Sequence, residues 1–169
     1  RGGIVFENLI HGGNQERGRR SGTENVVGIV GMGKAIEILI QEMSDKNKKL
    51  AKLIDSLLDG LLSIEDTKLN GPDKAGRLPN NVNVSFKNVE GESLLLNLDL
   101  SGILASSGSA CTSGAIDASH VLQAIGVEEE YIHGSLRLSV SKYNTEEEIK
   151  EAVVVIRDTV ERLRKLNRR

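Results

Sequence analysis

The sequence contains a single cysteine, Cys111, and few aromatic residues, with two Phe, two Tyr and no Trp among its 169 residues. One cysteine cannot form an internal disulfide, which favours a reducing compartment such as the cytoplasm and leaves the thiol either inert or chemically used. The scarcity of aromatic rings argues against a stacking platform for single-stranded nucleic acid. No apolar run reaches 18 residues, so we expect no membrane-spanning helix.

The chain also lacks an excess of charge of either sign and any metal-binding pattern. Its formal net charge of -2 gives no electrostatic reason to expect nucleic acid or a membrane surface as the main partner. His11, His120 and His133 do not have metal-ligand spacing, and one cysteine cannot build a zinc site, so we expect no metal. With 38% hydrophobic and 27% charged residues, the composition is that of a globular protein.

The hydrophobic pattern predicts one long helix, or two in tandem, from about residue 24 to residue 62. Ser21 and Glu24 have the spacing of a capping box at its start, with Thr23 and Asn25 as rival caps. Apolar residues lie nearly all round the helix up to Met43, which is typical of a helix that is buried or wedged between domains. Beyond residue 44 they occupy one face only. We therefore expect a domain boundary there, with residues 1–44 and 45–169 in different domains.

Residues 45–169 have the pattern of short strands between helices. Residues 82–86, 103–105 and 134–141 are predicted strands, and in the last of these Leu136, Leu138 and Val140 face one way while Arg137 faces the other. Short helices are expected at 92–98 and from about 119 to 125. A final helix follows a capping box made by Thr145 and Glu148. The predicted fold is α/β, a two-layer sandwich with a small sheet.

Three features could carry chemistry. Cys111 lies in the stretch SSGSACTSG, whose small residues indicate a mobile loop and do not desolvate the thiol; an incidental surface cysteine is the alternative. Arg137 is the one charge on an alternating strand, and a guanidinium suits a carboxylate, although an exposed strand arginine is common. The glycine-rich loop that leads to Thr23 precedes a helix N-terminus and could hold a phosphate, or could be a solvated basic loop.

Taken together, these stretches resemble the cysteine desulfurases of the NifS/IscS-like group, which are pyridoxal-phosphate enzymes of the class V aminotransferase family. The resemblance is carried by HGGNQERGRRSGTENVVGIVGMGKA, NVNVSFKNVEGESLLLNLD, SSGSACTSG and HGSLRLSVSKYNTEEEI, in that order. It implies fold type I of the pyridoxal-phosphate transferases, with residues 1–44 as the tail of the large cofactor-binding domain. Residues 45–169 would be the small C-terminal domain.

The resemblance also implies a role for each candidate residue. Cys111 would accept sulfur from L-cysteine as a persulfide while the substrate becomes L-alanine, and Arg137 would hold the substrate carboxylate. Thr23 would reach the cofactor phosphate of the partner subunit in a homodimer. The sulfur would pass to an acceptor or scaffold protein for iron–sulfur cluster or thio-cofactor assembly.

The sequence departs from the family pattern in two places. Residues 12–14 are GGN where the family usually has three glycines, and the S-x-H-K motif with the Schiff-base lysine is absent. The chain therefore resembles the C-terminal part of the enzyme, and we expect it to be inactive alone and to self-associate through the apolar helix. Two alternatives are a stand-alone persulfide carrier or partner-binding module, and a selenocysteine lyase-like class V enzyme.

Overall fold

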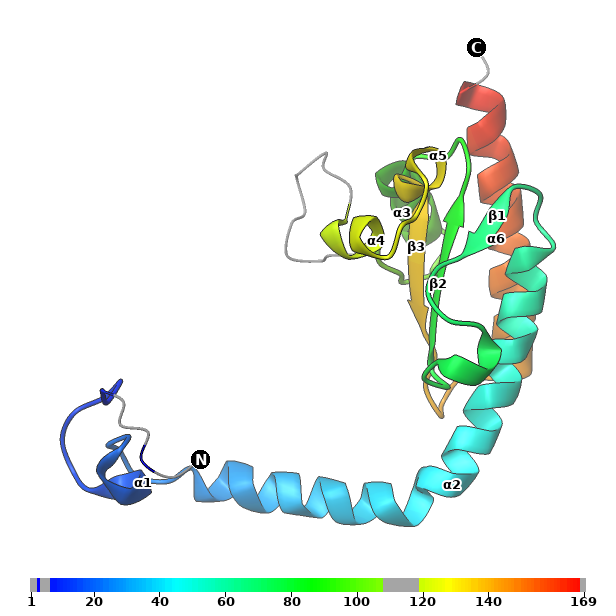
Figure 1. The fold of residues 1–169 in the computed structure, drawn as a ribbon. Helices are drawn as coiled ribbons and strands as arrows, with labels where there is room; N and C mark the ends of the chain where they lie inside the picture. The colour runs from blue at the N-terminus through cyan, green and yellow to red at the C-terminus, as the bar shows by residue number, and fades with distance from the viewer. Residues whose placement is uncertain (1–2, 4–6, 108–118, 168–169) are drawn as a thin grey trace. The chain divides into compact units, whose positions relative to one another are not determined.

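The computed structural model describes residues 3, 7–107 and 119–167, and divides into two compact units, Arg1–Met43 and Ser44–Arg169. The long predicted helix is present as α2 (Val26–Leu62), which runs through the boundary between the units. Figure 1 shows the elements in chain order. None of the helices in the described ranges is long and apolar enough to cross a membrane.

The first unit contains the short helix α1 (Gln15–Gly18) and the first half of α2. The apolar side chains of this half of α2, which is expected to be buried or wedged between domains, are exposed among the described residues. Their exposed fractions run from 40% to 85% for Val26, Val27, Ile29, Val30, Met32, Ile36, Ile38, Leu39, Ile40 and Met43. The described residues of the first unit therefore do not cover this apolar stretch.

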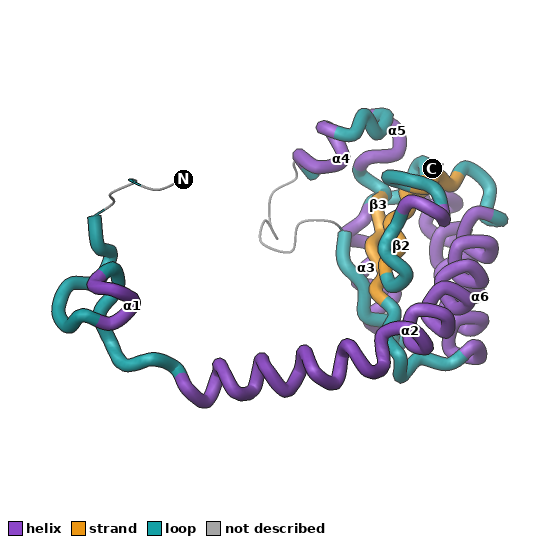
Figure 2. Tube along the Cα trace, turned by 60° about the horizontal axis from the view of Figure 1, so that its bottom comes forward, coloured by secondary structure: helices purple, strands orange, loops and turns teal. Residues whose placement is uncertain are grey.

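The second unit is built on a three-stranded antiparallel sheet in the order β1 (Thr67–Leu69), β2 (Asn81–Phe86) and β3 (Ser135–Ser139). The second half of α2 and the helix α6 (Glu146–Asn167) lie side by side next to the strands (Figures 1 and 2). The helix α3 (Gly91–Leu100) packs on α6 and β3. A 3-10 turn (Lys74–Gly76) and the short helices α4 (His120–Ala124) and α5 (Glu129–Ile132) complete the unit.

The core lies between one face of the sheet and these helices. The strands contribute the alternate residues Val82, Val84, Phe86, Leu136 and Leu138, and the helices contribute one stripe each, as expected for a half-buried antiparallel sheet. The largest helical contributions to this cluster are Leu53, Leu57, Leu58, Leu61, Leu94, Leu98, Ile149, Val153, Ile156 and Val160. The opposite face of the sheet is left to polar side chains.

Hydrogen bonds stabilise both ends of α6. At the start, the predicted capping box is confirmed, because Thr145 N donates to Glu148 Oε2 (2.9 Å) and Glu148 N donates to Thr145 Oγ1 (3.2 Å). Near the end, the Arg164 guanidinium donates to the carbonyl oxygens of Lys87, Glu65 and Asp66 at 3.0, 2.8 and 3.1 Å. Arg164 thus ties the last turns of α6 to the segments that flank β1 and β2.

Two predicted local features were wrong. Residues 103–105 do not form a strand, because α3 ends in a C-terminal motif in which Gly102 has φ +79° and Ile103 N donates to Leu98 O (2.9 Å). The next residue, Ser106, forms an isolated β-bridge with Arg137. The Ser21 capping box is not formed either, because α2 starts at Val26 and the Asn25 side chain accepts from Gly28 N (3.0 Å), as in the rival Asn25 cap.

We predict that Arg164→Ala lowers the free energy of unfolding by about 1–3 kcal/mol, because three carbonyl groups lose a charged donor. Urea denaturation measures the change. Lys165→Ala, at the neighbouring exposed position, serves as the control and is expected to change stability by less than about 0.5 kcal/mol. Equal effects of the two substitutions would contradict this role for Arg164.

The capping box predicts a pH dependence of stability. The backbone N–H of Thr145 and then the Asn144 side chain lower the pKa of Glu148 below its ordinary value of 4.5. A carboxyl whose pKa is lowered by folding stabilises the protein above its unfolded pKa, and this contribution is lost as the pH falls through the folded pKa. Glu148→Gln should therefore destabilise the protein at pH 7 but not near pH 3. Urea midpoints between pH 7 and pH 3 test this, with Glu147→Gln as the charge-matched control.

Candidate functional site

Four polar residues form a row across the sheet. Asn83 on β2 is paired with Arg137 on β3, Arg137 forms the isolated bridge with Ser106, and Asn70 N donates to Asn83 O (2.9 Å). Residues that are directly opposite in an antiparallel sheet point to the same face. Because the flanking Val82, Val84, Leu136 and Leu138 face the core, this row lies on the polar face.

Arg137 is the cation of this row, and it is exposed on the face opposite Leu136 and Leu138, as the alternation predicted. Within residues 7–107 and 119–167, no hydrogen bond or ion pair of its guanidinium is found. The group can therefore bind a ligand carboxylate through two parallel N–H donors without first breaking an internal ion pair.

The segment that leads to Cys111 is attached to the strand that carries Arg137. Ser106 N donates to Arg137 O (3.0 Å), Arg137 N donates to Ser106 O (2.6 Å), and the Ser135 hydroxyl donates to Ser107 O (3.3 Å). Cys111 itself lies outside the described residues. It is four residues beyond Ser107, so the two Cα atoms are at most about 14 Å apart.

Two glycines allow the backbone to approach closely at this place. A Cβ on Gly134 would lie 2.0 Å from Phe86 O, and one on Gly91 would lie 2.9 Å from His133 O and 3.4 Å from Ser107 Cβ. Gly134 O also accepts from Phe86 N (3.0 Å), which extends the pairing of β2 with β3 by one pair. These close contacts fix the register that brings Asn83 opposite Arg137.

The loop before α2 belongs to the first unit and is closed by Ser21. The buried Ser21 hydroxyl donates to Gly13 O (2.8 Å), and Ser21 N donates to Ile10 O (3.2 Å). These bonds explain why Ser21 does not cap the helix. Thr23 follows two residues later and is exposed.

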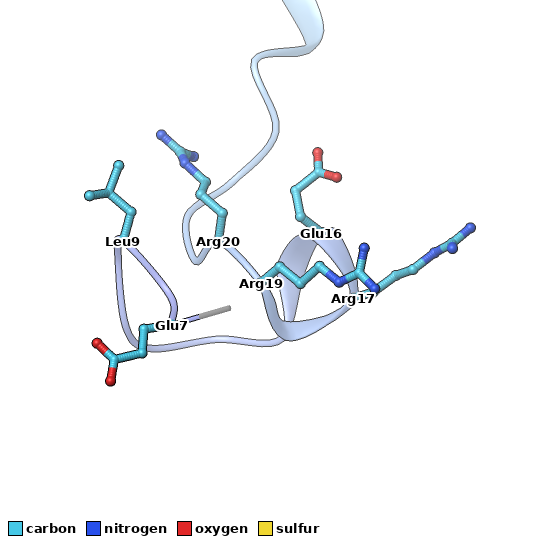
Figure 3. A pocket seen from close by; sticks show the side chains of 6 residues that line it. All are labelled: Glu7, Leu9, Glu16, Arg17, Arg19 and Arg20. Carbon is cyan, nitrogen blue, oxygen red and sulfur yellow. The ribbon is translucent and has the colours of Figure 1, made fainter. Parts of the chain in front are cut away.

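A cavity of about 550 Å³ in this unit is rich in arginine. Figure 3 shows its lining side chains, which are Glu7, Leu9, Glu16, Arg17, Arg19 and Arg20. The three guanidinium groups are donors of the kind that the cofactor phosphate implied by the resemblance would need, but two carboxylates line the same cavity and Thr23 does not line it. Lys34, the only lysine of residues 1–43, lies on α2 and is bonded to Glu37 (3.0 Å). We therefore do not assign it to the cofactor.

The polar face also contains residues that the sequence did not single out. Asn70, Asn83, Ser106 and Ser135 were not predicted as site residues. In the predicted strand at 82–86, Asn81, Asn83 and Ser85 alternate with apolar residues, which is the pattern of a polar face, but the sequence does not identify the partner strand. Among the described residues, no cluster of His, Cys, Asp and Glu could hold a metal ion.

Comparison with known proteins identifies the family. Residues 3–152 match the family described as aminotransferase class-V, so the chain belongs to that family. Its relatives include proteins named cysteine desulfurase IscS from Clostridium botulinum (51% identity over 98% of this chain) and Methanosarcina thermophila (52% over 99%). The resemblance to NifS/IscS-like cysteine desulfurases is therefore confirmed. The chain spans 42% and 41% of the length of these two relatives.

Solved structures support the fold. A NifS-like protein is 40% identical with a TM-score of 0.77, over 94% of this chain and 40% of that one. The NifS-like protein from Rickettsia africae is 31% identical with a TM-score of 0.78, over 94% and 41%. The expected α/β fold class, that of the pyridoxal-phosphate enzymes of fold type I, is confirmed.

We predict that Gly134→Ala destabilises the second unit by at least about 1–3 kcal/mol, because the new methyl group would collide with the Phe86 backbone where β2 and β3 are paired. Chemical denaturation measures the loss. Gly31→Ala is the control: its added Cβ meets no atom within 4 Å beyond its own stretch of helix backbone, and alanine in a helix is expected to stabilise by about 0.5–1 kcal/mol. A fully stable Gly134→Ala variant would contradict this account of the close approach.

Proposed function

We propose that this chain is part of a pyridoxal-phosphate-dependent cysteine desulfurase that converts L-cysteine to L-alanine and holds the sulfur as a persulfide on Cys111. The observation that carries the proposal is the attachment of the Cys111 segment to the strand of Arg137 by the Ser106 bridge. The bridge places Ser106 beside the proposed carboxylate-binding group, and Cys111 is the fourth residue after Ser107. A structurally similar protein, SspA (28% identity, TM-score 0.54), is described in complex with cysteine.

Each residue has one task in this proposal. Arg137 binds the substrate carboxylate and orients the amino acid. The Cys111 thiolate attacks the substrate sulfur, the bond between this sulfur and Cβ breaks, and Cβ keeps the electron pair and gains a proton. The products are L-alanine and a Cys111 persulfide, so atoms and electrons balance. Pyridoxal phosphate, when bound, supplies the electron withdrawal that makes this cleavage possible.

The wider context is proposed on the same basis. Residues 1–44 would belong to the large domain and residues 45–169 to the small domain, supported by the division between Met43 and Ser44. Thr23 would contact the cofactor phosphate across a homodimer interface, supported by its exposed hydroxyl and the arginine-rich loop. A sulfur acceptor or iron–sulfur scaffold protein would take the persulfide sulfur. A reducing compartment, such as the cytoplasm, would keep the thiol available.

We predict distinct losses for two variants of the full-length enzyme. Cys111→Ala should abolish persulfide formation and leave the cofactor absorbance unchanged, because only the sulfur acceptor is removed. Arg137→Ala should raise KM for L-cysteine at least tenfold, because a charged hydrogen-bonding partner is lost. Alanine formation and mass spectrometry of the persulfide provide the measurements. Unchanged sulfur transfer in Cys111→Ala would disprove the proposal, and urea midpoints close to wild type exclude loss of folding as the cause.

A further inference from the structure

Asn83 lies at the position of β2 from which a side chain comes nearest to Arg137. Phe86 N donates to Gly134 O and Val140 N donates to Asn80 O, which places the hydrogen-bonded pairs at even-numbered residues of β2. The pair of Asn83 and Arg137 is therefore a non-hydrogen-bonded pair, in which the Cα atoms are about 4.5 Å apart and the side chains lie closest. The two side chains therefore leave the sheet from adjacent positions on its polar face.

The amide group of Asn83 is oriented by Asn70. The Asn70 side chain is only 7% exposed, and its Nδ2 donates to Asn83 Oδ1 (2.6 Å) and to Ser85 Oγ (2.8 Å). Asn70 is held in turn by its own N–H, which donates to Asn83 O, and by Arg77 Nη2, which donates to Asn70 O (3.0 Å). With Oδ1 turned to Asn70, the amide NH2 of Asn83 is left as a donor.

From this geometry we propose that Asn83 is a second carboxylate-binding residue, whose Nδ2 donates to the same substrate carboxylate as Arg137. The inference rests on the proposed function of Arg137 and extends it. A carboxylate has two oxygens with about four acceptor sites, so a guanidinium and an amide can bind it together. Both donors come from paired strands, which hold them more rigidly than a loop would.

The pair also predicts how the enzyme selects its substrate. An aminothiol without a carboxylate leaves the donors of Arg137 and Asn83 without their partner, and sites built for a polar group discriminate strongly against analogues that lack it. L-Cysteine and cysteamine differ only in the carboxylate. The contribution of Asn83 should therefore appear with L-cysteine and be absent with cysteamine.

The test uses Asn83→Asp in the full-length holoenzyme that also carries Cys111→Ala, so that no sulfur is transferred. Aspartate keeps an oxygen acceptor for Asn70 but removes the amide donor. Titration calorimetry should show L-cysteine binding weakened about ten- to hundredfold, the range for loss of a hydrogen bond to a charged group, whereas cysteamine should bind no more weakly than before. Asn83→Ala, which adds no charge, should show the same selective loss.

Asn81→Asp is the matched control. Asn81 lies two residues earlier on the same face of β2, opposite Ser139, and its substitution adds the same charge. We expect it to change the L-cysteine affinity by less than about twofold. Urea midpoints of all variants show whether folding is affected. If Asn83→Asp unfolds, the binding data for Asn83→Ala test the role of Asn83.

The outcomes separate this inference from the proposed function. If Arg137→Ala does not weaken L-cysteine binding, the proposed role of Arg137 fails. If Arg137→Ala weakens it but Asn83→Asp and Asn83→Ala behave like Asn81→Asp, only the role of Asn83 is overturned. Equal weakening of L-cysteine and cysteamine by the Asn83 variants would also overturn it, because Asn83 would then hold the site together without binding the carboxylate.

Discussion

The antiparallel pairing of β2 with β3 is the constraint on which the candidate site depends. It places Asn83 opposite Arg137, and the close approach at Gly134 extends and fixes it. Side chains alternate between the two faces of a strand, so a slip by one residue would turn Arg137 into the apolar core and Leu136 or Leu138 out to solvent. The burial of Val82, Val84, Leu136 and Leu138 therefore stabilises the register of the polar row as well as the fold.

The core determines the position of the polar residues, but their chemistry depends on which of their side chains have hydrogen-bond partners within the protein. Asn70 is buried, and both hydrogen atoms of its amide group are used inside the protein. Arg137, two strands away in the same row, is exposed and has no acceptor in the described part of the chain. At one end of the row, the Asn70 amide NH2 group is fully hydrogen-bonded within the protein. At the other end, the Arg137 guanidinium is exposed to a ligand. Such an arrangement suits a binding group that is supported by a rigid hydrogen-bonded network.

The sequence predicted the parts of this arrangement that have a clear period. Alternation around Leu136 and Leu138 gave the strand and the outward face of Arg137, and the Thr145 and Glu148 spacing gave the start of α6. The three residues of β1 are too few to show a period, so the role of Asn70 could not be found. The apolar residues 103–105 suggested a strand, but the N–H of Ile103 is used to close the C-terminus of α3.

The separate roles proposed for Arg137 and Cys111 follow from how each residue is attached to the fold. Arg137 is part of a sheet: its own N–H and C=O bond to Ser106, and its neighbours Leu136 and Leu138 are paired with β2. Cys111 is the fourth residue after Ser107, so its Cα is at most about 14 Å from that of Ser107. A substrate held by its carboxylate on a rigid strand would therefore lie within reach of the chain that carries the thiol. The bridge between Ser106 and Arg137 is therefore the contact that couples substrate binding to sulfur transfer in this proposal.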